Sequence, residues 1–455
     1  MKKFSLFLSF IGIFFCGPAI AKFIPQDVAT SMAAQAENSA PKAKLPGNTS
    51  GTLTADERKQ LIRLMLQAIL ERNQFGQRPA MSFADFMQRA QELEQKNSQA
   101  KHFQDQEDEA FHSAFYFKGR PQLMFQGTPD YAAELKDTKY IFISEASNHG
   151  QQSLVEHTIS ILETLRAANP GANLLLANEF SVARDTYVWP IRFANVQNEN
   201  IITYDEYSDL EKAADRLGID ILALDETSSF TDELGESYAK VGPQWVAFDK
   251  KDPRIQTFSK ELGLDFNDSR QALAAFQYFL YSNDYGVELR NRQWGAYIKV
   301  LKDFYHIVVV YAGSAHLRFA GSKNSVPLML NPKNAVVISL NSDEKLSAEE
   351  QQHYENREKL QEQFTPKAKD TAAIQTFNDG KGAENLSDIP ERKLDFSKPH
   401  FRRYDGKVMN KWCEEHIRNQ EALEVWQQQH KAYEDLVGKS PLYFPDWLTL
   451  DVYLH

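Results

Sequence analysis

Side chains that can carry out acid–base chemistry follow four short apolar runs of this 455-residue chain. The polar segments are Ser144-Glu145-Ala146-Ser147-Asn148-His149-Gly150, Asn178-Glu179-Phe180, Asp225-Glu226-Thr227 and Ala312-Gly313-Ser314-Ala315-His316. Histidine and carboxylate side chains brought to one place can activate water as general bases, or they can bind a metal ion. A histidine suits the first task because its ordinary pKa lies close to physiological pH.

The apolar runs predict the strands of a sheet, and the stretches between them predict helices. Strands are predicted at Tyr140–Ile143, Leu174–Ala177, Ile219–Leu224 and His306–Tyr311, and helices at Gln152–Ala168, Asp209–Leu217 and Arg290–Phe304. Such an alternation is typical of an α/β fold with a mostly parallel central sheet covered by helices. Ligands bind these sheets beyond the carboxyl ends of the strands, so the four polar segments are expected to meet at one end.

Each of these acidic residues also has a purely structural interpretation. Glu145 or Glu179 alone is as typical of a surface loop as of a site. Asp225 and Glu226 are expected to cap a following helix, because carboxylates accept hydrogen bonds from the free N–H groups there. His316 alone would be a hydrogen-bonded loop histidine. The convergence of these segments on one end of a sheet is what favours a functional site.

Two basic residues lie beside predicted helix starts. Gly150 follows His149 just before a helix, and such a turn lets the imidazole face a helix N-terminus, where a developing anion is stabilised. Arg290 begins another predicted helix, and its structural alternative is an ion pair with Asp284 or Glu288. Both basic residues are therefore site candidates.

Four segments, in order along the chain, resemble the motifs of the erythromycin-esterase-like and ChaN-like superfamily. They are Ile143–Gly150, where Glu and His follow the first strand; Leu174–Phe180, a second strand ending in Glu; Arg290–Arg292, which opens a helix; and Val308–Leu317, a late strand ending in Gly-x-x-His. The resemblance covers roughly residues 136–340. The sequence departs from the family pattern at Ser144, where a glycine commonly precedes the glutamate, and in its long C-terminal extension.

The resemblance implies hydrolysis of an ester, lactone or amide by water that a histidine activates. His149 would be the general base, and Glu145 or Glu179 would orient it and raise its basicity. His316 would act as a second acid–base group or polarise the carbonyl. Arg290 would bind a substrate carboxylate or stabilise the oxyanion. The expected substrate is a small molecule or a peptide.

The same residues support other functions. His149, His316, Glu145 and Glu179 form a reasonable ligand set for a divalent transition metal such as Mn, Zn or Fe. The wider family includes haem-iron-binding proteins, and the plentiful Tyr and His residues leave a haem site open. The sequence does not decide between an esterase-like hydrolase without a cofactor, a metal- or haem-binding protein and a non-enzymatic secreted binding factor.

The first residues predict a secretory signal peptide. Two lysines precede the apolar stretch Phe4–Phe15, and an Ala-x-Ala sequence predicts cleavage after Ala21. The apolar stretch is shorter than the roughly 20 residues that span a bilayer. Cleavage leaves a net charge of −11 − 2 = −13 and Cys413 as the only cysteine, so no intramolecular disulfide is expected. The protein is expected to be exported to the periplasm, the cell surface or the medium.

The rest of the chain is expected to have four parts. They are a flexible linker at 22–53, a helical N-terminal segment at 54–135, the α/β core with the site at 136–345 and a charged, aromatic-containing, mainly helical extension at 346–455. Helices outside the core are expected at Ala55–Arg72 after an N-cap at Thr54, at Phe83–Gln95 after a capping box of Ser82 and Asp85, and at Ala348–Phe364. The C-terminal extension is a candidate docking segment for a protein partner.

Composition and missing motifs exclude several classes of protein. With 42% hydrophobic, 12% aromatic and 25% charged residues, the chain is not collagen-like, disordered throughout or a polytopic membrane protein. The net charge of −11 and the lack of a dense Lys/Arg run make nucleic acid a poor partner. The chain has no Gly-x-Ser-x-Gly elbow, no His-Glu-x-x-His motif and no P-loop, so three common catalytic sites are not indicated.

Overall fold

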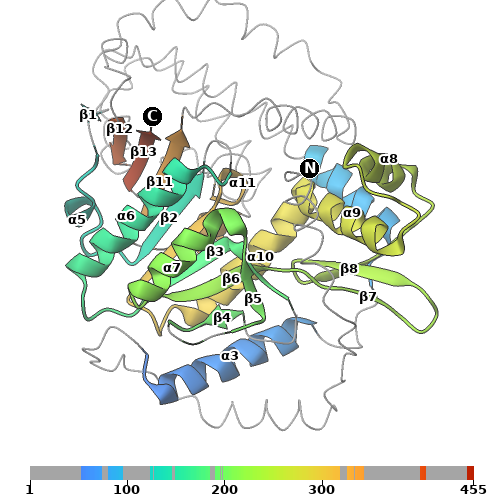
Figure 1. Ribbon diagram of the computed structural model, residues 1–455, viewed down its shortest axis with the longest axis horizontal. Coiled ribbons are helices and arrows are strands. Elements are labelled where there is room, and N and C mark those ends of the chain that lie inside the picture. Colours follow the sequence, from blue (N-terminus) through green and yellow to red (C-terminus); the bar gives the residue numbers. More distant parts are fainter. Residues whose placement is uncertain are drawn as a thin grey trace, which may run out of the picture.

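A ten-stranded sheet forms the centre of the protein in the computed structural model (Figure 1). The structure describes residues 53–73, 80–95, 123–126, 128–145, 149–184, 190–194, 196, 198–317, 325–330, 332, 334–342, 400–405 and 448–454. In spatial order the strands are β1 (Leu123–Gln126), β12 (His400–Asp405), β13 (Leu448–Leu454), β11 (Ala335–Ser342), β2 (Tyr140–Glu145), β10 (Ile307–Gly313), β3 (Leu174–Ala183), β6 (Asp220–Glu226) and β4 (Ile191–Arg192), with β5 (Ile201–Thr203) paired to β3.

The four strands predicted from the sequence, β2, β10, β3 and β6, lie side by side in the middle of this sheet. All three of their pairings are parallel: Val308 of β10 lies beside Tyr140 of β2 and Leu175 of β3, and Leu176 of β3 lies beside Ile221 of β6. The carboxyl ends of these strands therefore lie along the same side of the sheet, called the carboxyl edge below, and the polar segments follow there.

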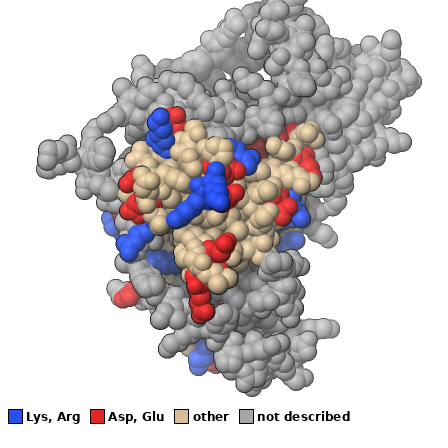
Figure 2. All heavy atoms as spheres, turned by 90° about the vertical axis from the view of Figure 1, so that its right-hand side faces the viewer, with Lys and Arg blue, Asp and Glu red and all other residues tan. Residues whose placement is uncertain are grey.

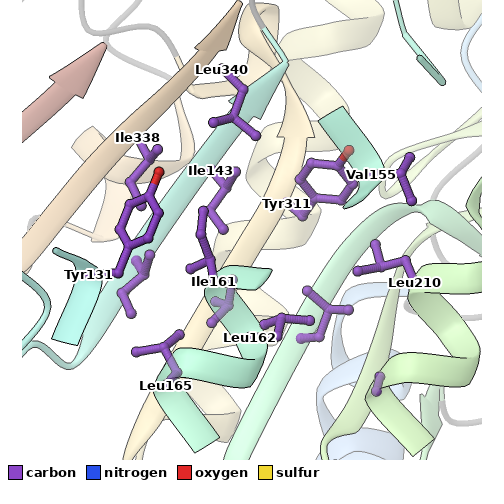
Figure 3. Close-up of a cluster of buried hydrophobic side chains, with 14 of the residues drawn as sticks. Tyr131, Ile143, Val155, Ile161, Leu162, Leu165, Leu210, Tyr311, Ile338 and Leu340 are labelled. Carbon is purple, nitrogen blue, oxygen red and sulfur yellow. The ribbon is translucent and has the colours of Figure 1, made fainter. Parts of the chain in front are cut away.

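Helices cover both faces of the sheet, as the apolar strands require. The helical elements are α3 (Ala55–Asn73), a helix at 83–95, α5 (Tyr131–Glu134), α6 (Gln152–Ala168), η2 (Asp205–Tyr207), α7 (Ser208–Arg216), α8 (Pro253–Glu261), α9 (Ser269–Ser282), α10 (Asp284–Leu301), α11 (Ser314–Leu317) and α12 (Val326–Leu330). On one face α6 and α7 pack on strand residues such as Ile143 and Tyr311, and Figure 3 shows part of this core. On the other face α3 and α10 pack on alternate strand residues such as Val308. The predicted α/β fold class is confirmed.

Both predicted N-terminal helices are present, with their predicted caps. The Thr54 hydroxyl accepts a hydrogen bond from the backbone N–H of Glu57 (3.3 Å), and the Glu57 carboxylate accepts one from the N–H of Thr54 (2.7 Å). At the helix of residues 83–95, the N–H of Asp85 donates to the hydroxyl of Ser82 (3.0 Å). These contacts satisfy backbone groups that the first turn of a helix leaves free.

A second, smaller core lies beyond β6 and was not predicted. It contains a three-stranded antiparallel sheet of β7 (Ser229–Thr231), β8 (Ser237–Val241) and β9 (Gln244–Ala247). Buried residues of β8 and β9 pack with α8, α9 and the helix of residues 83–95. In Figure 1 this small sheet extends from the side of the molecule next to β6.

The outer strands of the large sheet were also not predicted. Strand β13 pairs in parallel with β11 and antiparallel with β12, so two segments of the C-terminal extension join the sheet as strands. The rest of the predicted helical extension, including Ala348–Phe364, lies outside the described residues, as do the signal peptide and nearly all of the linker at 22–53. Among the helices that the structure describes, none has both the length and the apolar character needed to cross a membrane.

Candidate functional site

The sequence-predicted site residues gather at the carboxyl edge of the sheet, with the carboxylates on three neighbouring strands. Glu145 is the last residue of β2 and lies beside Gly313, the last residue of β10. Glu179 lies in β3 where the register against β6 shifts between Asn178 and Val182. A β-bulge of this kind redirects a side chain. Asp225 ends the neighbouring strand β6 together with Glu226.

His149 and Glu145 form a hydrogen-bonded pair. The distance between His149 Nδ1 and Glu145 Oε2 is 2.9 Å, and the His149 side chain is 40% exposed whereas that of Glu145 is fully buried. Gly150 follows His149 with a φ of +77°, which other residues rarely adopt, and its backbone N–H donates to Glu145 Oε2 (3.4 Å). A carboxylate facing Nδ1 favours the tautomer with its proton on Nδ1, which places the lone pair of the imidazole on Nε2.

Two buried tyrosines also bind the Glu145 carboxylate. Tyr207 donates its hydroxyl hydrogen to Glu145 Oε2 (2.9 Å), and Tyr311 donates to Oε1. Burial raises the pKa of Tyr207 and of Tyr311, and the Glu145 carboxylate raises both further. Both hydroxyls therefore stay protonated and remain hydrogen-bond donors at neutral pH.

A second group of charges, next to this pair, is centred on Arg290 of α10. Its Nε donates to Asp225 Oδ1 (2.9 Å), and one terminal nitrogen donates to both Asp225 Oδ2 (2.5 Å) and Glu179 Oε1 (2.7 Å). Burial raises the pKa of Asp225, although Arg290 opposes this. Burial also acts to raise the pKa of Glu179, but His316 and Arg290 together hold it well below its usual range. Glu179 is therefore an anion in this network.

His316 belongs to the buried part of the site. Its Nε2 lies 3.2 Å from Glu179 Oε1, its Nδ1 lies 2.6 Å from Asn291 Oδ1, and its ring packs on Trp294 with 4.1 Å between centroids. Burial lowers the pKa of His316, and the nearby Arg290 also lowers it, while Glu179 opposes them. With a side chain only 4% exposed, His316 has much less access to solvent than His149.

The two groups meet at Gly313. Its backbone N–H donates to Glu179 Oε2 (2.7 Å). A Cβ at this position would lie 2.5 Å from Cε1 and 3.0 Å from Nε2 of His149, and 3.5 Å from Glu179 Oε2. Only glycine therefore leaves room for the imidazole, which explains why a glycine precedes His316 by three residues.

Several structural alternatives from the sequence were wrong. A helix does not follow Asp225 and Glu226, since β7 comes next, and the two carboxylates bind Arg290 and Lys240 instead. Arg290 does not pair with Glu288, because the carboxylate of Glu288 pairs with Arg292. Four side chains that complete the site were not predicted from the sequence, namely Tyr207, Tyr311, Asn291 and Trp294. Only the polar type of Asn291, beside Arg290, could have indicated a role, because Tyr and Trp in apolar stretches are typical of a core.

The four residues predicted as metal ligands do not form a metal-binding group. Nowhere in the described part of the chain are three His, Cys, Asp or Glu side chains placed so that they could hold one metal ion. Both oxygens of Glu145 accept hydrogen bonds from tyrosines, and those of Glu179 face Arg290, His316 and the N–H of Gly313. Hydrogen-bond donors of the protein thus contact these carboxylate oxygens.

Comparison with known proteins adds no relative. No family model, curated protein or solved structure matches the chain. Any function must therefore be inferred from the chemistry of the groups at the carboxyl edge of the sheet.

Proposed function

We propose that the protein is an exported hydrolase of the erythromycin-esterase-like and ChaN-like superfamily, in which His149 activates water for attack on an ester, lactone or amide. The observation that carries the proposal is the pair of an exposed histidine and a buried carboxylate, 2.9 Å apart. This arrangement supplies a base that reaches solvent and an anion that stabilises the base once it is protonated.

The reaction consumes one water, and His149 accepts one proton and later gives it up. Nε2 of His149 takes a proton from water while the oxygen attacks the carbonyl carbon, which gives a tetrahedral oxyanion. Collapse of this intermediate breaks the bond to the leaving group, and the imidazolium returns its proton to the leaving oxygen or nitrogen. During the intermediate, the charge of Glu145 stabilises the imidazolium, and Tyr207 and Tyr311 hold that carboxylate in place.

In this scheme Glu145, not Glu179, orients the base. Glu145 contacts His149 directly, whereas Glu179 is bound to Arg290, His316 and Gly313. The guanidinium of Arg290 is already shared between two carboxylates, which supports a positioning role over direct contact with an oxyanion. The buried group would thus fix the end of β10 against which His149 packs.

The test is hydrolysis of a panel of p-nitrophenyl esters and of lactones by the full chain at pH 7.5. His149→Asn keeps a nitrogen near the place of Nδ1, and so the contact with Glu145, but removes Nε2. Its kcat/KM is expected to fall by about 10²- to 10⁴-fold, the usual contribution of a general base. His157→Gln is the matched control, because His157 lies in α6 and binds Tyr131 through Nε2, which a glutamine replaces. Unchanged activity in His149→Asn would show that His149 is not the base.

A further inference from the structure

Strand β7 is an outer strand of the small antiparallel sheet. It pairs with β8, and β9 lies on the other side of β8, so that no strand of the described chain pairs with the second side of β7. Exposed strands of this kind are commonly protected by a lysine, a proline or a bulge. The sequence of β7, Ser-Phe-Thr, has neither residue, and its register against β8 is regular. The second side of β7 is therefore open to a further strand.

The hydrogen bonds that flank β7 determine which of its backbone groups point outward. They run from Lys240 N–H to Ser228 O (2.9 Å) and from Asp232 N–H to Glu236 O (2.8 Å). In an antiparallel pair, residues that bond to the partner strand alternate with residues whose N–H and C=O groups point away from it. By this alternation, Ser229 and Thr231 point outward, and both are exposed. They offer two N–H donors and two C=O acceptors, enough for four hydrogen bonds to an added strand.

Phe230, between these two residues, has an apolar ring that an added strand would cover. It is 46% exposed, although large apolar side chains are usually covered. Its ring stacks on Tyr238 of β8 with 4.9 Å between centroids and meets Trp245 of β9 edge-on at 5.0 Å. In an antiparallel pair, the residue opposite Phe230 would bring its side chain into contact with this ring.

The hairpin that β7 and β8 form is acidic. Asp232, Glu233 and Glu236 lie in it, and residues 228–238 contain no lysine or arginine. The exposed lysines Lys250 and Lys251 follow β9, on the far side of β8. Figure 2 shows the side of the molecule on which the small sheet extends, where Asp and Glu side chains lie among uncharged ones. The charge of this hairpin favours a cationic occupant, whereas a second copy of the chain would add another acidic hairpin.

We propose that β7 binds a basic, extended peptide as an added antiparallel strand. Backbone hydrogen bonds to Ser229 and Thr231 would give affinity, and alternate side chains of the peptide would give specificity. An apolar side chain would lie on Phe230, and a lysine or arginine two residues along would lie beside Asp232. Asp232 is on the ring side of the sheet, because its carboxylate accepts a hydrogen bond from the hydroxyl of Tyr238 (3.3 Å). The inference is independent of the proposed function, since β7 contains no residue of the candidate site.

The test is binding of the blocked peptide Lys-Thr-Val-Thr-Lys to the full chain, titrated by saturation-transfer NMR. With the valine opposite Phe230, one lysine lies opposite Asp232 and the threonines lie opposite Ser229 and Thr231. A control peptide with glutamate in place of both lysines is expected to bind about 4-fold more weakly or worse. A second control, N-methylated at both threonines, keeps the charge but loses two backbone donors, and its binding is expected to weaken by about 5-fold or more.

Variants of the protein test the same two features. Thr231→Pro removes an outward N–H, at a position where an outer strand tolerates proline, and is expected to weaken binding by about 2- to 13-fold. Thr231→Val is the matched control, because it loses the same hydroxyl but keeps the N–H. Glu233→Gln combined with Glu236→Gln should weaken binding by about 2- to 5-fold, whereas Glu156→Gln, which changes an exposed charge on α6, should not.

Each outcome supports or overturns the inference. Binding that is weakened by N-methylation and by Thr231→Pro, but not by Thr231→Val, supports strand addition at β7. The inference is wrong if the basic peptide does not bind, if the glutamate peptide binds as well, or if N-methylation has no effect. The N-methylated peptide keeps the test decisive even if Thr231→Pro does not fold. A dimer in sedimentation velocity that Thr231→Pro converts to a monomer would assign β7 to a second copy of the chain and overturn the inference.

Discussion

Replacing Arg290 by methionine should destabilise the protein far more than the same change at Arg292, two residues along α10. Arg290 makes three hydrogen bonds to Asp225 and Glu179, and its side chain is only 9% exposed. Its removal leaves two buried carboxylates without their cation, which typically costs about 3–5 kcal/mol. The Arg292 side chain is 52% exposed, and its pairing with Glu288 is expected to contribute about 1 kcal/mol or less.

The loss of stability in Arg290→Met should be smaller in acid than at neutral pH. In Arg290→Met, burial is left to raise the pKa of Asp225 and Glu179 with less to oppose it. A group whose pKa is raised by folding takes up a proton on folding, so acid favours the folded state of the variant. The gap in stability between the parent and the variant should therefore be largest at neutral pH and shrink as the pH falls.

Urea unfolding followed by circular dichroism at pH 7.5 and 5.5 measures both effects. The expected result is a much lower midpoint for Arg290→Met than for Arg292→Met at pH 7.5, with a smaller difference at pH 5.5. Equal midpoints for the two variants would refute the reasoning, because Arg290 could not then be the cation of a buried network. A gap that grows in acid would refute the proposed titration of Asp225 and Glu179.

Two further predictions follow from single positions. Gly313→Ala should lower kcat/KM by about 100-fold or more in the p-nitrophenyl ester assay, because its Cβ would lie 2.5 Å from Cε1 of His149. Gly263→Ala, with nothing within 4 Å of the new Cβ, should leave kcat/KM unchanged and lower only the stability, because the φ of +68° disfavours alanine. An active Gly313→Ala would show that the His149 ring does not need the space beside Gly313. Burial lowers the pKa of His157 to about 4, below the unfolded value of about 6.5, so this group makes stability fall as the pH drops from 6.5 to 4. In His157→Gln the thermal unfolding midpoint should fall less steeply over that range, and an unchanged slope would contradict the prediction.

The centre of the fold could be predicted because its strands are apolar on both faces. Runs such as Ile307–Tyr311 have no polar side to leave in water, so they indicate a sheet covered by helices. The helix over Gln152–Ala168 has its predicted bounds, since apolar residues recur along one face and Asn169 ends it. These signals are local, and a single sequence displays them directly.

The unpredicted elements depend on partners distant in the chain. Strand β13 belongs to the sheet only because β11 lies beside it, more than a hundred residues earlier. Strand β7 has three residues, all of them exposed, and is too short for an alternation of apolar and polar residues to indicate a strand. Both are consequences of tertiary pairing, which overrides local preference in short strands.

The site residues likewise divide into those that a local sequence pattern indicates and those that depend on tertiary contacts. Glu145, Glu179 and His149 could be identified because polar residues directly after buried strands are conspicuous. Their partners could not be assigned, because Tyr311 has the pattern of a core residue and its hydroxyl becomes meaningful only once β10 lies beside β2. The ionisable groups are thus recognisable in the sequence, whereas the groups that hold them are recognisable only in the structure.

Two charge groups of different exposure share the carboxyl edge, and their separation has a chemical consequence. Glu179 receives the N–H of Gly313, and Gly313 leaves the space that the His149 ring occupies. The buried ion pairs of Arg290 are therefore linked to the exposed base through one strand end, and Glu179 also interacts electrostatically with His149. A change in the buried group should act on His149 through β10 and through the charge of Glu179, and so affect both stability and rate, whereas a change at His149 Nε2 should affect the rate alone. Comparing Arg290→Met with His149→Asn in both assays separates the positioning of the base from its chemistry.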